Sequence, residues 1–241
     1  MARASLRVFL SLLLLFALRF RARLQLILGF TAGVLLGVVC FELLPEIFRL
    51  AQARALATAP AMVALVAGFL LFHALEKTVL VHHARESAYA SHRHPSAGVL
   101  SALALIAHSF MDGVGIGLSF QLSYAAGMVV ALAVIAHDFC DGLNTVGLML
   151  VTRNPSRRAI VMLLLDAAAP VLGAACSQLV RLPEGALLLY MGFFAGVLLY
   201  IGAADVLPEA HSQAGPALSA ALISLTALGA AFIFAVTRFT P

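Results

Sequence analysis

Two similar phrases in the chain carry side chains that can bind metal or move protons. They read AHSFMDG at residues 107–113 and AHDFCDG at residues 136–142. In each phrase a His precedes an Asp by four residues, a spacing that places both side chains on one face of a helix. Imidazole and carboxylate groups together suit a borderline divalent ion. The two phrases therefore predict a metal site shared by two facing helices.

Both phrases lie in the middle of long apolar stretches, so their ionisable groups are expected at mid-membrane depth. Burying a charged group there costs roughly 2.5–3.5 kcal/mol on insertion scales, and such residues usually mark functional sites. A bound cation would offset this cost. Polar contacts that merely join helices, or a proton relay without metal, are the alternative interpretations. The five ionisable groups in question are His108, Asp112, His137, Asp138 and Asp141.

The residue spacing predicts two adjacent metal positions. A short loop joins the two stretches, so their helices should be antiparallel neighbours, and the two His–Asp pairs can converge. Met111, Gly115, Cys140 and Asn144 fall on the same helical stripes. Ser109 and Asp138 each follow a His by one residue, about 100° around the helix, and would offer a second, oxygen-rich position. Sharing Asp112 and Asp141 between both positions would give a binuclear centre.

The composition indicates an integral membrane protein built from helices. The 241 residues are 63% hydrophobic and 11% charged, whereas soluble domains are about 45–50% apolar and about 25% charged. Helices are expected because lipid cannot satisfy backbone hydrogen bonds. The net charge of +4 comes mostly from loop arginines and indicates no nucleic-acid partner. The three cysteines are unclustered, which argues against a disulfide framework or a structural zinc site.

Hydropathy predicts a single all-α transmembrane domain over residues 1–241 with eight spans. The expected spans cover residues 5–18, 25–45, 56–80, 97–120, 124–151, 159–180, 186–207 and 216–237. The first could instead be a signal peptide, but it lacks a small-residue cleavage pattern, which favours a short span. Lys and Arg are more frequent on one side, predicting external termini and a cytoplasmic His-bearing loop at about residues 82–96.

A short phrase that occurs twice in the sequence suggests an inverted repeat. FELLPE closes the second span and ADVLPE closes the seventh, and with alternating spans these ends face opposite sides of the membrane. Spans 1–3 and 6–8 would then be related by inversion around spans 4 and 5, an arrangement common in secondary transporters. A chance match of a short phrase is the alternative.

Together these features resemble the ZIP (Zrt/Irt-like) family of divalent-metal transporters, as a divergent prokaryotic-type member. The resemblance lies in the eight spans, the His-bearing loop, His-x-x-x-Asp-Gly on span four, the similar phrase on span five and LPEAH closing span seven. It implies uptake of metal into the cytoplasm, by a homodimer in a bacterial inner membrane, with one helix bundle sliding against the other. Zn²⁺ would be the main substrate, with Fe²⁺, Mn²⁺ and Cd²⁺ as others.

The resemblance also implies roles for individual residues. His108, Asp112, His137 and Asp141 would be the primary ligands, with Asp138 and Ser109 completing the second position. The chain departs from the family pattern in two places. Span four usually has His-Asn and often a Glu one turn on, where this chain has Ser109 and Asp112. Some relatives have Glu-Pro in span six, where this chain has Ala-Pro; Asp166, about one turn earlier, would take the place of that Glu as the bridging ligand of the second position.

Further acids and histidines are weaker candidates. Glu42 replaces a His that relatives often carry before LLPE, and it would receive metal at the outer mouth. Asp205, Glu209 and His211 would form an exit at the inner end of span seven. Solvated acids and helix capping are the alternatives. Loop histidines would bind metal loosely, or be unremarkable polar residues of a wet loop: His82, His83, His92 and His94.

A metal transporter is therefore the predicted function, and no catalytic residue is assigned. The first alternative is an intramembrane metal-dependent hydrolase, but HExxH is missing and only Asp138 offers a base. The second is a proton-coupled carrier or a passive channel, which these residues do not separate from a carrier driven by the metal gradient. The chain has no P-loop, which argues against ATP-driven pumping.

Overall fold

Long helices make up the part of the chain that the computed structural model describes, residues 23–88, 95–212 and 214–239. No strand occurs within these ranges. Six helices are long and apolar enough to cross a membrane: Arg23–Ala53, Gly98–Leu122, Tyr124–Leu150, Ser156–Ser177, Glu184–His211 and Pro216–Arg238. The labelled elements, which include the further helix α3, are η1 (Val39–Leu43), α2 (Leu44–Ala53), α3 (Ala59–Ala88), α4 (Pro95–Leu122), α5 (Tyr124–Val151), α6 (Ser156–Ser177), α7 (Glu184–Tyr200), η2 (Ile201–Val206), α8 (Leu207–His211) and α9 (Pro216–Phe239).

The six candidate spans confirm six of the eight predicted ones. The predicted third span corresponds to α3, whose apolar part, Ala59–Leu75, is shorter than the other spans although the helix continues beyond it. The predicted first span, residues 5–18, lies outside the described residues, as does the part of the His-bearing loop at residues 89–94. The chain is thus an all-helical integral membrane protein, and the complete set of eight spans stays a prediction.

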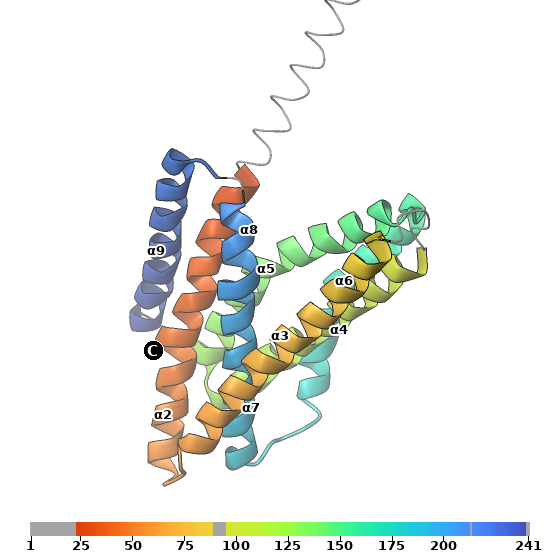
Figure 1. Cartoon of the computed structure of the whole chain (residues 1–241). Coiled ribbons are helices and arrows are strands. Elements are labelled where there is room, and N and C mark those ends of the chain that lie inside the picture. The colour runs from red at the N-terminus through yellow and green to blue at the C-terminus, as the bar shows by residue number, and fades with distance from the viewer. Residues whose placement is uncertain (1–22, 89–94, 213, 240–241) are drawn as a thin grey trace, which may run out of the picture.

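Successive helices run in opposite directions, as crossing the membrane at each span requires (Figure 1). Side-chain contacts join the ends of helices that are far apart in the sequence. Near one end of the molecule Gln25 donates to the carbonyl of Ala210 at 3.0 Å. Near the other, Arg54 and Glu184 form an ion pair at 2.8 Å. The helix termini therefore collect at two opposite ends.

Both LPE phrases follow a short π-helical segment. The backbone N–H of Leu44 donates to Val39, and that of Leu207 donates to Gly202, each five residues back instead of four. A proline follows each segment, and its ring clashes with the carbonyl four residues earlier, which favours the wider turn. The second span was predicted to end at its LPE phrase, but its helix continues to Ala53, because the π turn absorbs the proline. The helix of the seventh span ends at His211, with the LPEAH that was predicted to close it.

Glycines bring pairs of helices into backbone contact. A Cβ at Gly113 of α4 would meet the carbonyl oxygen of Pro170 on α6, and a Cβ at Gly173 would meet that of Phe110. Contacts of the same kind join α3 to α7 and the Arg23–Ala53 helix to α9. Small residues allow such packing inside a membrane, where no hydrophobic effect drives helices together.

The helices divide into two packed sets. The first, called the central group, consists of α4, α5 and α6, which pack mainly against one another. The second, called the outer group, consists of the Arg23–Ala53 helix, α3, α7–α8 and α9 (Figure 1). The two groups share one buried apolar cluster. Its members from the Arg23–Ala53 helix and α5 include Val34, Leu35, Val38, Val39, Val129, Val130, Ala133 and Val134.

Candidate metal centre

A single residue, Ser123, joins α4 to α5 and sets their antiparallel pairing. Its backbone is extended, with φ −154° and ψ 156°, and its hydroxyl accepts a hydrogen bond from the N–H of Ala126 at 3.0 Å. Ser is a preferred N-cap because its oxygen satisfies a free N–H of the first turn. His108 and His137 lie at similar distances along the chain from this turn, so the two helices present them at the same depth.

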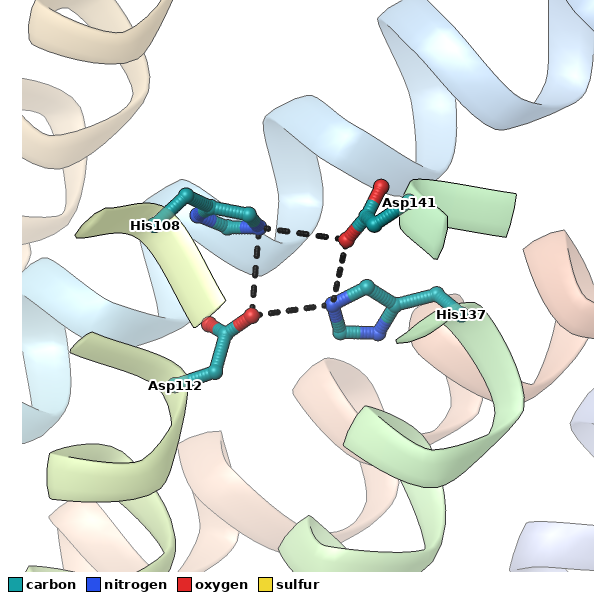
Figure 2. A group of neighbouring side chains, drawn as sticks. All are labelled: His108, Asp112, His137 and Asp141. Atoms are coloured by element: carbon teal, nitrogen blue, oxygen red, sulfur yellow. Dashed lines mark hydrogen bonds and ion pairs between the residues drawn. The ribbon is translucent and has the colours of Figure 1, made fainter. Parts of the chain in front are cut away.

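The two His–Asp pairs meet as the spacing predicted (Figure 2). Nε2 of His108 lies 3.1 Å from Oδ2 of Asp112 and 3.8 Å from Oδ2 of Asp141. Nε2 of His137 lies 3.0 Å and 3.9 Å from the same two oxygens. Nitrogen and oxygen atoms thus alternate around a ring, with all four ligand atoms within 4.8 Å of one another.

The donor set fits a divalent transition metal. Metal–ligand bonds of about 2.0–2.2 Å in a tetrahedral site separate neighbouring ligand atoms by roughly 3.3–3.6 Å, which lies between the observed 3.0 Å and 3.9 Å. Asp112 and His137 are each only 1% exposed. Oδ2 of Asp141 is buried without a hydrogen-bond donor. A buried carboxylate oxygen without a partner is costly, and a metal ion at this position would satisfy it.

The backbone of α5 orients the imidazole of His137. Its Nδ1 lies 3.0 Å from the carbonyl oxygen of Ala133, which can only accept, so Nδ1 carries a proton. When Nε2 carries no proton, its lone pair faces the centre, an arrangement typical of metal-binding histidines. Nε2 lies 3.0 Å from the Asp112 oxygen, so either a proton joins the two atoms in a hydrogen bond or a metal ion binds both.

Aromatic residues of the outer group contact the centre. The ring of Phe72 on α3 lies 5.0 Å from that of His108, measured between centroids. The hydroxyl of Tyr190 on α7 donates to the carbonyl of Met111 at 3.5 Å. The sequence analysis assigned neither aromatic residue a role, because nothing distinguishes them from other aromatic residues of an apolar span. Met111 itself is 46% exposed and does not point into the centre.

A cavity of about 200 Å³ lies beside the centre, between α4, α5 and α6. Its lining includes three side chains predicted for an oxygen-rich position: Ser109, Asp138 and Asp166. Ser109 donates to Oδ1 of Asp166 at 2.8 Å, and Thr145 donates to Oδ2 at 3.1 Å. Oδ1 of Asp138 is buried without a partner. The structure thus brings these oxygens together although they come from three helices.

The position of Asp166 follows from the packing of α6 on α4. One turn after Asp166, the backbone of Pro170 contacts Gly113. This contact holds the carboxylate of Asp166, which is 3% exposed, against Ser109. The Ala-Pro sequence, which replaces the Glu-Pro of some relatives, therefore still places an acid of α6 at the cavity.

Thr145 is fully buried and was not among the residues predicted for the site. Asn144, one residue earlier, was placed on the stripe of His137 and Asp141 but is exposed. A helix has 3.6 residues per turn, so residues seven and eight positions after His137 lie on either side of its stripe. Spacing alone did not show which of them faces α6. The side chain of Cys140, placed on the same stripe, is outside the described part of the structure.

The peripheral candidates lie apart from the centre. Glu42 is buried within η1. Asp205 and Glu209 are exposed, and Nδ1 of His211 bonds to the carbonyl of Leu207 at 3.0 Å. Among the described residues, His108, Asp112, His137 and Asp141 are the ones whose ligand atoms converge as a metal site requires. The proposed entrance and exit residues do not form such a group. The side chains of the loop histidines, His82, His83, His92 and His94, are not described.

Comparison with known proteins adds one match. A family model described as ZIP Zinc transporter matches residues 82–237, more than half of the chain. The matched segment contains α4 through α8 and nearly all of α9, and so includes all residues of the centre and the cavity. None of the curated proteins matches the chain.

Proposed function

The chain belongs to the ZIP zinc transporter family, which makes it an integral membrane transporter and not a hydrolase; from this premise we propose that it carries Zn²⁺ into the cytoplasm through the α4–α5 centre. The observation that carries this proposal is the buried ring of two imidazole nitrogens and two carboxylate oxygens. The ring is held by the central group, at the middle of its helices.

The ligand types suit a transported ion. Two imidazoles and two carboxylates bind Zn²⁺ and also accept Fe²⁺, Mn²⁺ and Cd²⁺. Sites made only of cysteine thiolates are closed and structural, whereas an ion held by carboxylates is released more easily. His108, Asp112, His137 and Asp141 are the ligands under this proposal, and each would exchange its contacts with the others for contacts with the metal.

A second cation position is proposed in the neighbouring cavity. Its ligands would be Ser109, Asp138 and Asp166, with Asp112 and Asp141 shared between the positions in a binuclear centre. The unpartnered oxygen of Asp138 supports this assignment, because a cation would satisfy it.

Acids and a histidine near the two ends of the molecule are proposed to guide the ion. Glu42 would receive metal on the outer side. Asp205, Glu209 and His211 would release it on the inner side. Their placement supports this, because Glu42 lies in η1, on the half of its helix toward Ala53, whereas Asp205 lies in η2 and Glu209 and His211 lie in α8, which ends beside Gln25. The two sets therefore lie on opposite sides of the middle of the molecule.

Transport requires the centre to face each side in turn. We propose that the central group slides against the outer group, since their contact is largely apolar and few directional bonds would have to break. A homodimer in a bacterial inner membrane, with external termini, completes the arrangement. The π turn before each LPE phrase supports the inverted repeat of spans 1–3 and 6–8, because it gives the second and seventh spans a common local geometry.

Exchange of protons for metal is a second candidate mode of transport. The contact of His137 with Asp112 favours it, because a metal ion entering between these two acceptors would displace the proton that they share. A pH-sensitive dye inside proteoliposomes distinguishes the modes. Proton movement that is proportional to Zn²⁺ uptake indicates exchange, and uptake without it indicates a carrier driven by the metal gradient or a channel.

Uptake of radiolabelled zinc into proteoliposomes tests the proposed function. Wild type is compared with Asp112→Ala and with Glu184→Gln, a control at an exposed acid far from the centre. We expect saturable uptake by wild type and by the control, and none by Asp112→Ala. No uptake by wild type, with iron, manganese and cadmium tried in turn, would contradict the proposal. Equal uptake by all three proteins would contradict the site.

A further inference from the structure

Asp166 is the acid of the cavity whose two oxygens both accept hydrogen bonds from other helices. Ser109 of α4 donates to Oδ1 at 2.8 Å, and Thr145 of α5 donates to Oδ2 at 3.1 Å. All three residues are at most 3% exposed. The carboxylate plane is therefore set by two hydroxyl groups on opposite sides, and not by its own flexible torsions.

Thr145 uses its hydroxyl differently from Thr152, the residue that caps the C-terminal end of α5. The hydroxyl of Thr152 bonds to the carbonyl of Leu148 in the last turn of that helix at 2.7 Å, a local bond to the backbone. Thr145 instead donates to a carboxylate on a neighbouring helix. A buried hydroxyl directed at a ligand oxygen corresponds to the outer partners that orient ligands in metal sites.

The cavity offers oxygen ligands and room for water. Its polar lining consists of Ser109, Asp138 and Asp166, without a nitrogen or sulfur ligand. A carboxylate has about four lone-pair positions, so Asp166 keeps free ones after accepting two hydrogen bonds. A volume of about 200 Å³ exceeds what a bare ion needs and leaves space for bound water. Carboxylate, hydroxyl and water ligands favour hard cations such as Mn²⁺ over Zn²⁺.

We propose that Thr145 is a positioning residue that orients Asp166 for a hard divalent cation in the cavity, and thereby sets the metal preference of the second position. This inference rests on the proposed function. Thr145 touches no metal itself. It acts through Asp166, and its removal would let the carboxylate rotate away from the cavity while the imidazole-containing position keeps its own ligands.

Binding of two metals to the purified full-length protein in detergent tests this role. The protein is first given one equivalent of Zn²⁺, which the imidazole-containing position prefers. Mn²⁺ is then titrated, and its binding is followed by the loss of the electron paramagnetic resonance signal of free Mn²⁺. Zinc affinity is measured separately by competition with a chelating dye. The variants are Thr145→Val, Thr145→Ser and, as a matched control at the C-cap of the same helix, Thr152→Val.

We expect zinc-loaded wild type to bind one further Mn²⁺, and Thr145→Val to bind it about 10- to 100-fold more weakly with unchanged zinc affinity, the usual effect of losing an outer partner. Thr145→Ser should restore Mn²⁺ binding because it keeps the hydroxyl, and Thr152→Val should behave as wild type. If the contact of Thr145 with Asp166 merely joined α5 to α6, Thr145→Val would instead weaken the binding of both metals and lower the thermal midpoint of unfolding.

Three results would overturn the inference: unchanged Mn²⁺ binding in Thr145→Val, parallel loss of both metals, or no Mn²⁺ binding by zinc-loaded wild type. The third result is measured on wild type alone, so it would contradict the inference even if Thr145→Val failed to fold. If wild type binds no Zn²⁺, the proposed function is contradicted as well. Binding of Zn²⁺ without binding of Mn²⁺ contradicts this inference alone.

Discussion

Asp112 and Asp141 face the same pair of imidazoles, but their carboxylates are not equally satisfied. Oδ2 of Asp112 lies 3.0–3.1 Å from both histidines, within hydrogen-bond distance. Oδ2 of Asp141 lies 3.8–3.9 Å from them and has no hydrogen-bond donor. Asp112 therefore joins the two histidines in the metal-free centre, whereas Asp141 would gain a partner when a metal binds.

This difference predicts opposite effects on stability. Asp112→Ala should lower the free energy of unfolding of the metal-free protein by about 1–3 kcal/mol, because it leaves two buried imidazoles without an acceptor. Asp141→Ala should leave it unchanged or raise it, because an unpartnered buried oxygen is removed. Both variants should lose the stabilisation that zinc provides. Thermal unfolding in detergent, followed by circular dichroism with and without Zn²⁺, measures these effects.

Equal destabilisation by the two substitutions would show that Asp141 is satisfied in the metal-free protein. Glu184→Gln serves as the control, because its partner Arg54 is more than half exposed and such surface ion pairs contribute little.

Among the helices, the close contact of α4 with α6 decides whether the cavity exists. Gly113→Ala would place a methyl group against the Pro170 carbonyl and push the helices apart, at a cost of about 1–3 kcal/mol typical of overpacking. Asp166 would then move away from Ser109, and Mn²⁺ binding should fall.

The control is Gly147→Ala on α5, where a Cβ meets nothing within 4 Å and the substitution should add up to about 1 kcal/mol of stability. Equal thermal midpoints of the two variants would contradict this account of the packing.

One polar contact joins α5 of the central group to the Arg23–Ala53 helix of the outer group. The buried hydroxyl of Thr31 donates to the carbonyl of Ala136 at 3.2 Å, next to His137 of the candidate centre. Under the sliding proposal this bond breaks in each cycle. Thr31→Val, which keeps the shape, should raise the maximal rate of zinc uptake about two- to tenfold, the equivalent of one hydrogen bond of about 0.5–1.5 kcal/mol.

The control for Thr31 is Thr226→Val, since the hydroxyl of Thr226 donates to Gly29 at 2.9 Å within the outer group. Its uptake rate should match that of wild type. An unchanged or slower rate for Thr31→Val, measured in proteoliposomes at saturating Zn²⁺, would mean that this contact does not limit the movement.

For the whole molecule, alternating helix directions and the distribution of Lys and Arg predict which connections face the cytoplasm. In a background with the three cysteines replaced by serine, Gly185→Cys should react with a membrane-impermeant maleimide in intact cells, and Arg157→Cys only after the membrane is permeabilised. Both positions are exposed and lie at the starts of α7 and α6, at opposite ends of the molecule. The reverse labelling pattern would invert the proposed orientation and make the chain an exporter.

Hydropathy and helical spacing were enough to predict six of the spans and the convergence of His108, Asp112, His137 and Asp141, because both depend on periodicity within one helix or two joined by a short turn. The extension of the second span beyond its LPE phrase was not predicted, since a π turn depends on how the backbone relaxes around proline. The contacts of Asp166 with Ser109 and Thr145 required tertiary structure, because they depend on where α6 packs against α4. Backbone contacts at Gly113 and Gly173 set that position, and no spacing along a single helix encodes it.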